Sequence, residues 1–197
     1  MGTLLEMIQA GKSQKSISTF LDGLTHEQRV KEVEAVGGKS QHCLFQIALP
    51  DLEFSDLMPE ASGPLQEVIF HGKNSLPLFS LFQKRMALSL DRKKVFGYNF
   101  QTFQNFTGPG CFVVDQSTDR PGEIMIDYTR LPDENVPGWP AIKANTSGVT
   151  KLVYGHMKDY LRRVSKNVFI GEATKKENRS GNISFFAVLK KFRNLFK

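Results

Sequence analysis

Short strand-like segments that follow one another with only turns between them dominate the last two thirds of the chain. The first four are Val68–Phe70, Met86–Leu90, Val95–Phe103 and Cys111–Asp115. In the third of these, Phe96, Tyr98 and Phe100 recur at every second position and share one face. No long helical pattern separates the segments, which argues against a doubly wound parallel sheet. The pattern favours an antiparallel meander that closes into a barrel or curls strongly.

The same reading predicts further strands towards the C-terminus. They are Glu123–Arg130, Lys151–Tyr154, Val168–Ala173 and Ile183–Leu189. Pro77 interrupts the apolar run from Leu76 to Phe82, so this run is expected to be a turn or a short helix. The pattern of residues 156–164 fits a helix and a strand equally well. Six to eight strands are therefore expected, and an eight-stranded barrel can enclose one small ligand.

The N-terminal part has a helical pattern instead. Apolar residues recur at helical spacing, and Thr25 followed by Gln28 forms a capping box for one of three or four short helices. Residues 49–64 contain Pro50, Pro59 and Pro64 and carry several acids, which is typical of a linker. We therefore expect an α+β protein with a helical region at 1–48, a linker at 49–64 and a β-barrel domain at 65–197, with the helices packed on the barrel.

Composition and charge narrow the function classes. The 197 residues carry a net charge of +6, which is modest and spread along the chain, so nucleic acid is not an expected partner. Cys43 and Cys111 are the only cysteines and are expected to be free, buried thiols. With four histidines and no metal-binding spacing, no metal and no cofactor are expected. The N-terminus lacks the pattern of a signal peptide, and a cytoplasmic location is predicted.

Several residues are candidates for a binding site. The chain has 16 phenylalanines, which build a core or line an apolar cavity without polar atoms. Alternation in Ile124–Arg130 places Asp127 on one face and Tyr128 on the other, so Asp127 is either an exposed acid or a polar group inside the barrel. His71 ends a strand next to Lys73 and is either a turn residue or a general base.

Two segments outside the strands were also candidates for contacts. Trp139 lies in a proline-stiffened loop, where it either plugs the barrel end or caps a cavity. Near the C-terminus, Val188, Phe192, Leu195 and Phe196 fall on one helical face among basic residues. This pattern is typical of a short amphipathic helix that binds an anionic membrane or a partner groove, and equally of a tail packed on the body.

Three stretches together resemble a known family. They are Gly122–Pro132, Gly138–Pro140 and Tyr160–Gly171, with Asp-Tyr at a strand end, a loop, and a Leu-Arg-x-Val…Ile-Gly hairpin. They resemble uncharacterised bacterial proteins with a lipocalin-like (calycin-type) small barrel, over about two thirds of the chain. The resemblance implies an apolar cavity for a small lipophilic ligand with a few polar residues near its mouth.

Non-catalytic binding of a small apolar or lipid-like molecule is therefore the leading functional hypothesis. Its expected site has a polar end and an aromatic lining, formed by Asp127, Tyr128, Arg130, Tyr98, Phe96, Phe112, His71 and Trp139. One alternative is an enzyme on the same cavity that uses His71 or Asp127 as a base. The other is a basic adaptor that docks on an anionic membrane or nucleic acid through the C-terminal tail. The sequence leaves the oligomeric state open.

Overall fold

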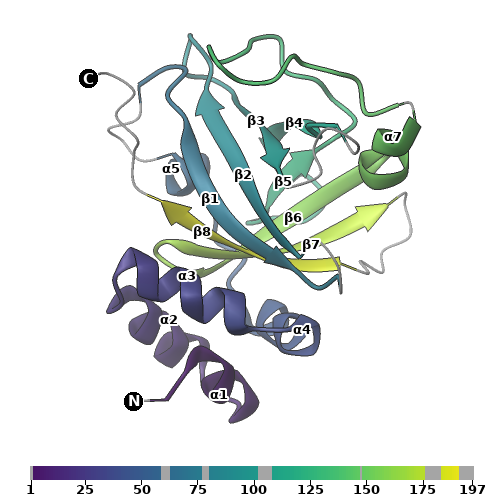
Figure 1. Cartoon of the computed structure of the whole chain (residues 1–197). Coiled ribbons are helices and arrows are strands. Elements are labelled where there is room, and N and C mark those ends of the chain that lie inside the picture. Colours follow the sequence, from purple (N-terminus) through teal and green to yellow (C-terminus); the bar gives the residue numbers. More distant parts are fainter. Residues whose placement is uncertain are drawn as a thin grey trace.

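The computed structural model describes residues 2–58, 63–76, 80–101, 108–146 and 148–175, together with the backbone of 183–190. Its centre is a barrel of antiparallel strands that follow chain order and close by pairing of the first with the last (Figure 1). The strands are β1 (Val68–Asn74), β2 (Leu81–Leu88), β3 (Val95–Phe100), β4 (Cys111–Gln116), β5 (Ile124–Asp127), β6 (Met157–Ser165), β7 (Val168–Lys175) and β8 (Ile183–Lys190).

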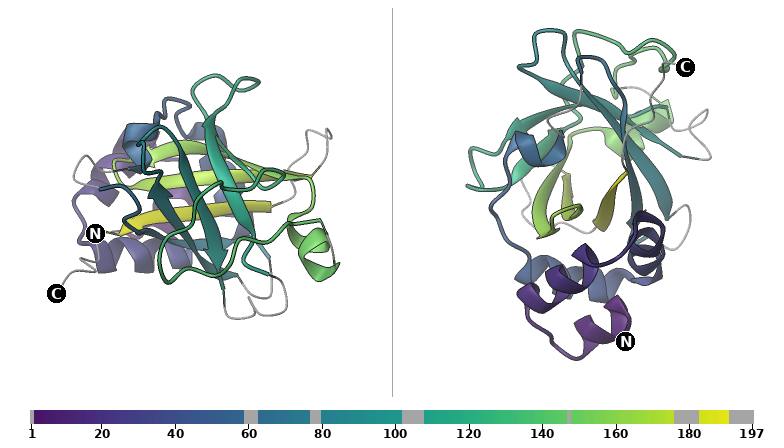
Figure 2. Two further views of the ribbon diagram at one scale, coloured as in Figure 1. Left: turned by 90° about the horizontal axis from the view of Figure 1, so that it is seen from above. Right: turned by 90° about the vertical axis from the view of Figure 1, so that its left-hand side faces the viewer.

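Helices cover one side of this barrel, and one short helix lies at each of its ends. They are α1 (Leu4–Gln9), α2 (Gln14–Asp22), α3 (His26–Ala35), α4 (Gly38–Ile47), α5 (Phe54–Leu57) and α7 (Gly148–Tyr154). The first four form a layer against the outer surface of the barrel (Figures 1 and 2), where they contact β1, β6, β7 and β8. The expected α+β architecture, with N-terminal helices packed on a closed or strongly curled antiparallel sheet, is confirmed.

Alternation along each strand separates an inner from an outer set of side chains. Phe70, Met86 and Phe112 belong to the inner set, which forms one apolar cluster with residues from β1 to β7. Val168 and Ile170 on β7 point the other way and join Leu44 and other helix residues in a second cluster. The helices therefore gain their stability from the outer surface of the barrel, because each is too short to persist alone.

Local signals explain where the helices begin. The expected capping box is present in α3, where the Thr25 hydroxyl accepts from the Gln28 amide and the Gln28 side chain accepts from the Thr25 amide. Contacts over long sequence separations then hold the layer in place. For example, Gln14 donates to the carbonyl of Val164 at 3.0 Å, and Gln41 donates to that of Lys73 at 3.2 Å.

The two ends of the barrel differ. Strands β1, β3, β5 and β7 end where α7 lies, and we call this the α7 end; the opposite one is the α5 end (Figure 1). At the α5 end, Leu52, Leu57 and Met58 belong to the inner apolar cluster and close the barrel. The segment 49–64, expected to be a linker, thus contributes a short helix and apolar residues to the core.

Two further expectations about local structure were wrong. Strand β2 begins at Leu81, so the end of the run attributed to a turn or helix at 76–82 is strand; residues 77–79 lie outside the described part. Residues 151–154 are the end of helix α7 rather than a strand. The three apolar residues after Lys151 are too few to define a period, and here the packing of Tyr154 against Tyr128, with ring centroids 5.3 Å apart, accompanies the helix. Residues 157–165, left open between helix and strand, form β6.

The inner surface also requires a glycine. Gly97 on β3 lies opposite Phe112 on β4, and the Phe112 ring occupies the space next to its Cα. A Cβ at this position would lie 2.1 Å from the carbonyl oxygen of Arg85 and 2.8 Å from the Phe112 ring. These are backbone and fully buried ring atoms that cannot move away cheaply.

Replacing Gly97 by alanine is therefore expected to destabilise the barrel by about 1–3 kcal/mol or more, as overpacking of a core does. Urea denaturation followed by circular dichroism measures the change. An unaltered unfolding midpoint would show that the strands β3 and β4 do not pack as closely as described.

The closure of the α5 end depends on an ion pair. Arg163 on β6 contacts the carboxylate of Asp56 at 2.6 Å and that of Asp51 at 2.8 Å. Burial alone would raise the pKa of Asp56, but the hydrogen bond from Arg163, a backbone hydrogen bond and the charge of Arg163 outweigh it, so the pKa lies below its ordinary value of 3.8. A carboxyl with a depressed pKa contributes stability above its ordinary pKa and loses it as the pH falls through the folded-state pKa.

We expect Asp56→Asn to lower the free energy of unfolding at pH 7 by about 0.5–1 kcal/mol, a value discounted for the partial exposure of the pair. The difference from the unaltered protein should shrink as the pH falls below 3.8 and through the lower folded-state pKa of Asp56, because both side chains are neutral below that pKa. Urea titrations at a series of pH values test this, and a difference that persists at low pH would contradict it.

Candidate functional site

A buried polar cluster lies inside the barrel near its α7 end. It consists of Lys84 on β2, Asn99 on β3, Asp159 on β6 and Tyr128 just after β5, and each of them is at most 7% exposed. Antiparallel register places Lys84 directly opposite Asn99, and both point inwards because Met86 and Val95 on the same faces do. Asp159 points inwards for the same reason, between Met157 and Leu161.

Hydrogen bonds connect all four side chains. The Lys84 ammonium donates to Asp159 Oδ2 at 2.8 Å, to the Tyr128 hydroxyl at 2.5 Å and to Asn99 Oδ1 at 3.2 Å. The Tyr128 hydroxyl donates to the same Asp159 oxygen at 3.1 Å and accepts from Asn99 Nδ2 at 2.8 Å. Because Lys84 has three protons and three acceptors here, its hydrogen-bonding capacity is used within the cluster.

The environment of this cluster is apolar. The Lys84 nitrogen lies 5.5, 5.3 and 5.1 Å from the ring centroids of Phe82, Phe112 and Tyr128, respectively. Burial lowers the pKa of Lys84, against the charge and hydrogen bond of Asp159, which raise it. Burial also raises the pKa of Tyr128 well above its ordinary value, and the charge of Asp159 adds to that shift. The phenol therefore stays protonated and can donate to the carboxylate.

One atom of the cluster is left over. Asp159 Oδ1 is buried and has no hydrogen-bond partner among the residues that the structure describes. A buried acceptor without a partner costs about 1–3 kcal/mol, so it is uncommon unless water or a ligand supplies the donor.

A pocket of about 330 Å³ opens at the same end of the barrel. Its lining comes from the segment after β5 and from the approach to and end of α7, and includes Tyr128, Leu131, Asn145 and His156. Asn145 donates to the carbonyls of Cys111 and Tyr128, both at 2.8 Å, and so fixes this segment to the barrel. Its buried Oδ1 likewise has no partner among the described residues.

The residues expected to form one site are divided by the barrel wall. Phe112 and Tyr128 lie inside, with ring centroids 5.3 Å apart. Asp127 lies on the outer face, because Ile126 and Tyr128 on either side of it point inwards; it is buried and accepts from the Thr129 amide at 2.8 Å. His71 also faces outwards, towards α3, with its ring centroid 5.7 Å from that of His26.

The other four expected site residues also lie outside the barrel. Trp139 packs edge-on against Phe96 and Tyr98, and its indole nitrogen donates to Glu67 at 2.7 Å. It therefore fixes residues 132–140, which we call the strap, across the outer face of β2 and β3. It neither plugs nor caps the barrel end. Arg130 is exposed and forms an ion pair with Asp115.

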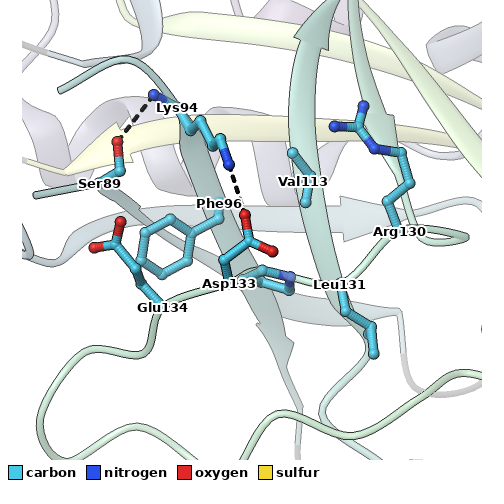
Figure 3. Close-up of a pocket in the computed structure, with 9 residues that line it drawn as sticks. Ser89, Lys94, Phe96, Val113, Arg130, Leu131, Asp133 and Glu134 are labelled. Atoms are coloured by element: carbon cyan, nitrogen blue, oxygen red, sulfur yellow. Dashed lines mark hydrogen bonds and ion pairs between the residues drawn. The ribbon is translucent and has the colours of Figure 1, made fainter. Parts of the chain in front are cut away.

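A second pocket, of about 230 Å³, lies beneath the strap. Phe96, Val113 and Arg130 line it, and Lys94 bridges the turn after β2 to the strap by bonds to Ser89 and Asp133 (Figure 3). Lys94 and Arg130 both have an acidic partner, Asp133 at 2.6 Å and Asp115, respectively. The charges at this pocket thus hold the strap in place.

Lys84, Asn99 and Asp159 were not among the expected site residues, although their positions carry a signal. In β2 and β6 each charged residue interrupts an alternating apolar face, namely Phe82, Met86 and Leu88 around Lys84, and Met157 and Leu161 around Asp159. The expected strand begins only at Met86, because Pro77 favours a turn or a short helix at residues 76–82, and the pattern of residues 156–164 fits a helix and a strand equally well. Only a correct strand assignment reveals that both charges face inwards.

Within the described residues, no group of three or more histidine, cysteine or acidic side chains lies together in a way that could hold a metal ion. No helix of that same part of the chain is both long and apolar enough to cross a membrane. No protein-family model matches the chain, and no curated protein is significantly similar to it.

Because the ion pair between Lys84 and Asp159 is buried, the effect of replacing one residue on the free energy of unfolding should depend on whether the other is present. Lys84→Met leaves the Asp159 charge without its counter-charge and is expected to cost about 3–5 kcal/mol of unfolding free energy. Replacing both residues, as Lys84→Met with Asp159→Leu, should recover much of this loss, since an apolar pair of similar volume removes both desolvation costs.

A double-mutant cycle measured by urea denaturation tests this coupling. Additive effects of the two substitutions would contradict it.

Proposed function

We propose that the protein binds a small apolar or lipid-like molecule at the α7 end of the barrel without transforming it, and that this molecule carries a hydroxyl or amine group. The observation that carries the proposal is Asp159 Oδ1, a buried carboxylate oxygen without a partner among the described residues. A donor on the ligand supplies the missing hydrogen bond in surroundings where such a bond is strong. This deepens the hypothesis drawn from the sequence, which left the polar group of the ligand open.

The character of the ligand follows from the surroundings of this oxygen. Phe82, Phe112 and Met157 are apolar neighbours in the inner cluster, which favours an apolar body. The charges of Lys84 and Asp159 compensate each other at 2.8 Å, which favours an uncharged ligand or a weakly held cation over an anion. A carboxylate ligand would face the Asp159 carboxylate and be repelled.

The direction of approach follows from the ends of the barrel. Leu52, Leu57 and Met58 close the α5 end. The pocket of about 330 Å³ lies at the α7 end and includes Tyr128, whose hydroxyl belongs to the polar cluster. Its volume is at the lower limit for small-molecule sites, which fits a compact ligand.

The rival hypothesis of an enzyme receives less support. His71 and Asp127, the expected bases, both lie on the outer surface of the barrel wall, where one faces α3 and the other accepts from Thr129. Lys84 has a lowered pKa, but its ammonium donates hydrogen bonds to three acceptors. A nucleophilic lysine would have to be neutral, so Lys84 is not arranged as a nucleophile. A binding function, by contrast, requires only Asp159 Oδ1 as an acceptor for the ligand.

A cytoplasmic location remains part of the proposal. Cys43 on α4 is exposed, in contrast to the expected burial, whereas Cys111 at the start of β4 is buried, and both are free. Burial raises the pKa of the Cys111 thiol, which keeps it protonated and unreactive. Two free thiols, one of them exposed, suit a reducing compartment.

The first test is native mass spectrometry of the protein purified from its own host, followed by organic extraction. We expect a one-to-one complex with a small apolar molecule that carries a hydroxyl or amine. In titrations with purified compounds, compact aliphatic and short isoprenoid alcohols should bind more tightly than the corresponding carboxylic acids.

Asp159→Asn should weaken alcohol binding roughly tenfold, the effect of losing a hydrogen bond to a charged acceptor. Asp127→Asn is the matched control, because Asp127 is also a buried acid but lies on the outer face of the wall. Equal effects of the two substitutions, or a protein that stays empty and shows no thermal shift with any alcohol, would refute the proposed site.

A further inference from the structure

Exposed apolar side chains gather at the α7 end of the barrel. They are Leu76 and Leu81 at the turn between β1 and β2, Phe100 at the end of β3, and Val149 and Leu152 on α7. Leu152 is 74% exposed and Leu81 is 52% exposed, values unusual for leucine in a folded domain. Antiparallel topology brings the end of β1, the start of β2, the end of β3 and α7 to one end of the barrel (Figure 1). All five residues belong to these elements or adjoin them, so they lie at this end.

Helix α7 presents two of these residues together. Val149 and Leu152 are three positions apart and so lie on neighbouring points of the helix surface. The opposite side of α7 carries Tyr154, which is buried against Tyr128. The helix is thus anchored by one side and exposes an aliphatic edge on the other, next to Lys151.

The exposed charged residues that the structure describes at the α7 end are mainly positive. The described residues of the segments 72–84, 97–112 and 135–158 include no aspartate or glutamate. Residues 176–182, which contain Glu177, lie outside the described part of the chain. Asp127 and Asp159, which adjoin this end, are both buried. Lys143, Lys151 and Lys175, by contrast, are exposed.

The α5 end carries charges of both signs. Acidic residues cluster in the turns and in the segment around α5, namely Asp51, Glu53, Asp56, Asp91, Asp115, Asp119, Glu123, Asp133 and Glu134. Several of them pair with arginine, as Asp56 does with Arg163. Basic residues lie at the same end and nearly balance these acids, so the excess of positive charge is at the α7 end; they are Arg92, Lys93, Lys94, Arg120, Arg130, Arg162, Arg163 and Lys166.

We propose that the α7 end is a membrane-docking surface that binds the face of an anionic lipid bilayer. Exposed aliphatic and aromatic side chains insert at the level of the head groups, and surrounding lysines attract anionic lipid. The free energies of apolar burial and of electrostatic attraction add in the binding. The absence of acidic residues from the three loop segments removes the repulsion that such a surface would otherwise impose.

This surface differs from the basic C-terminal tail expected to bind membranes. Residues 191–197 lie outside the part of the chain that the structure describes, and the side chains of β8 are not described either. The docking proposal rests on the α7 end alone and does not depend on the proposed ligand. If both hold, the pocket at this end faces the lipid surface.

Flotation with lipid vesicles tests the docking surface in the full-length protein. We expect binding to vesicles of phosphatidylcholine and phosphatidylglycerol, little binding to phosphatidylcholine alone, and release by high salt because the attraction of the lysines is screened. Val149→Ser combined with Leu152→Ser should reduce partitioning roughly tenfold, because two apolar side chains no longer insert. Lys151→Glu should have an effect of similar size, since it replaces a favourable charge by a repelled one.

Matched controls come from the other end of the barrel. Leu90, in the turn between β2 and β3, is 65% exposed, so Leu90→Ser removes a comparable apolar side chain from the wrong place. Lys93→Glu does the same for charge. Both controls should bind vesicles as the unaltered protein does.

A tail variant, Lys191→Glu with Arg193→Glu, separates the two candidate surfaces. Loss of binding in this variant together with normal binding of the α7 variants would overturn the proposal. So would failure of the unaltered protein to bind anionic vesicles. Loss of ligand binding measured without vesicles bears only on the pocket, so the two proposals fail independently.

Discussion

Closure of the barrel imposes the constraint on which the rest of the structure depends. Once β1 pairs with β8, every strand has one row of side chains enclosed and one row outside. The enclosed rows fuse into one apolar cluster, so room there is limited and Phe112 needs a glycine opposite it. On the outer face, Val164 on β6 and Val168 and Ile170 on β7 are apolar, and the helical layer covers them.

This enclosure explains why four polar side chains inside the barrel are noteworthy. Lys84 and Asp159 pay a desolvation cost that is offset only because each finds a charged partner and because Tyr128 and Asn99 complete the hydrogen bonds. An apolar pair would serve stability as well or better. Stability alone therefore does not account for this ion pair, and the proposed function rests on its remaining acceptor, Asp159 Oδ1.

The two ends of the barrel have different structural features. The α5 end is sealed by leucines and a methionine and held by Arg163 through two carboxylates. The α7 end carries the polar cluster, a pocket and the exposed apolar rim. The apolar seal with its ion pairs and the features of the proposed binding site thus lie at opposite ends of the barrel.

The sequence by itself determined the fold class, because a two-residue period and a helical period are local properties that survive in any context. The short N-terminal helices, the capping box at Thr25 and the strand β3 follow from it. Only the tertiary structure decided which face of each strand is enclosed, and hence that Asp127 and His71 lie outside while Asp159 and Lys84 lie inside. It also made residues 148–154 a helix. The reason is that register and closure join strands far apart in the chain, so the side that becomes interior depends on partners that no local pattern contains.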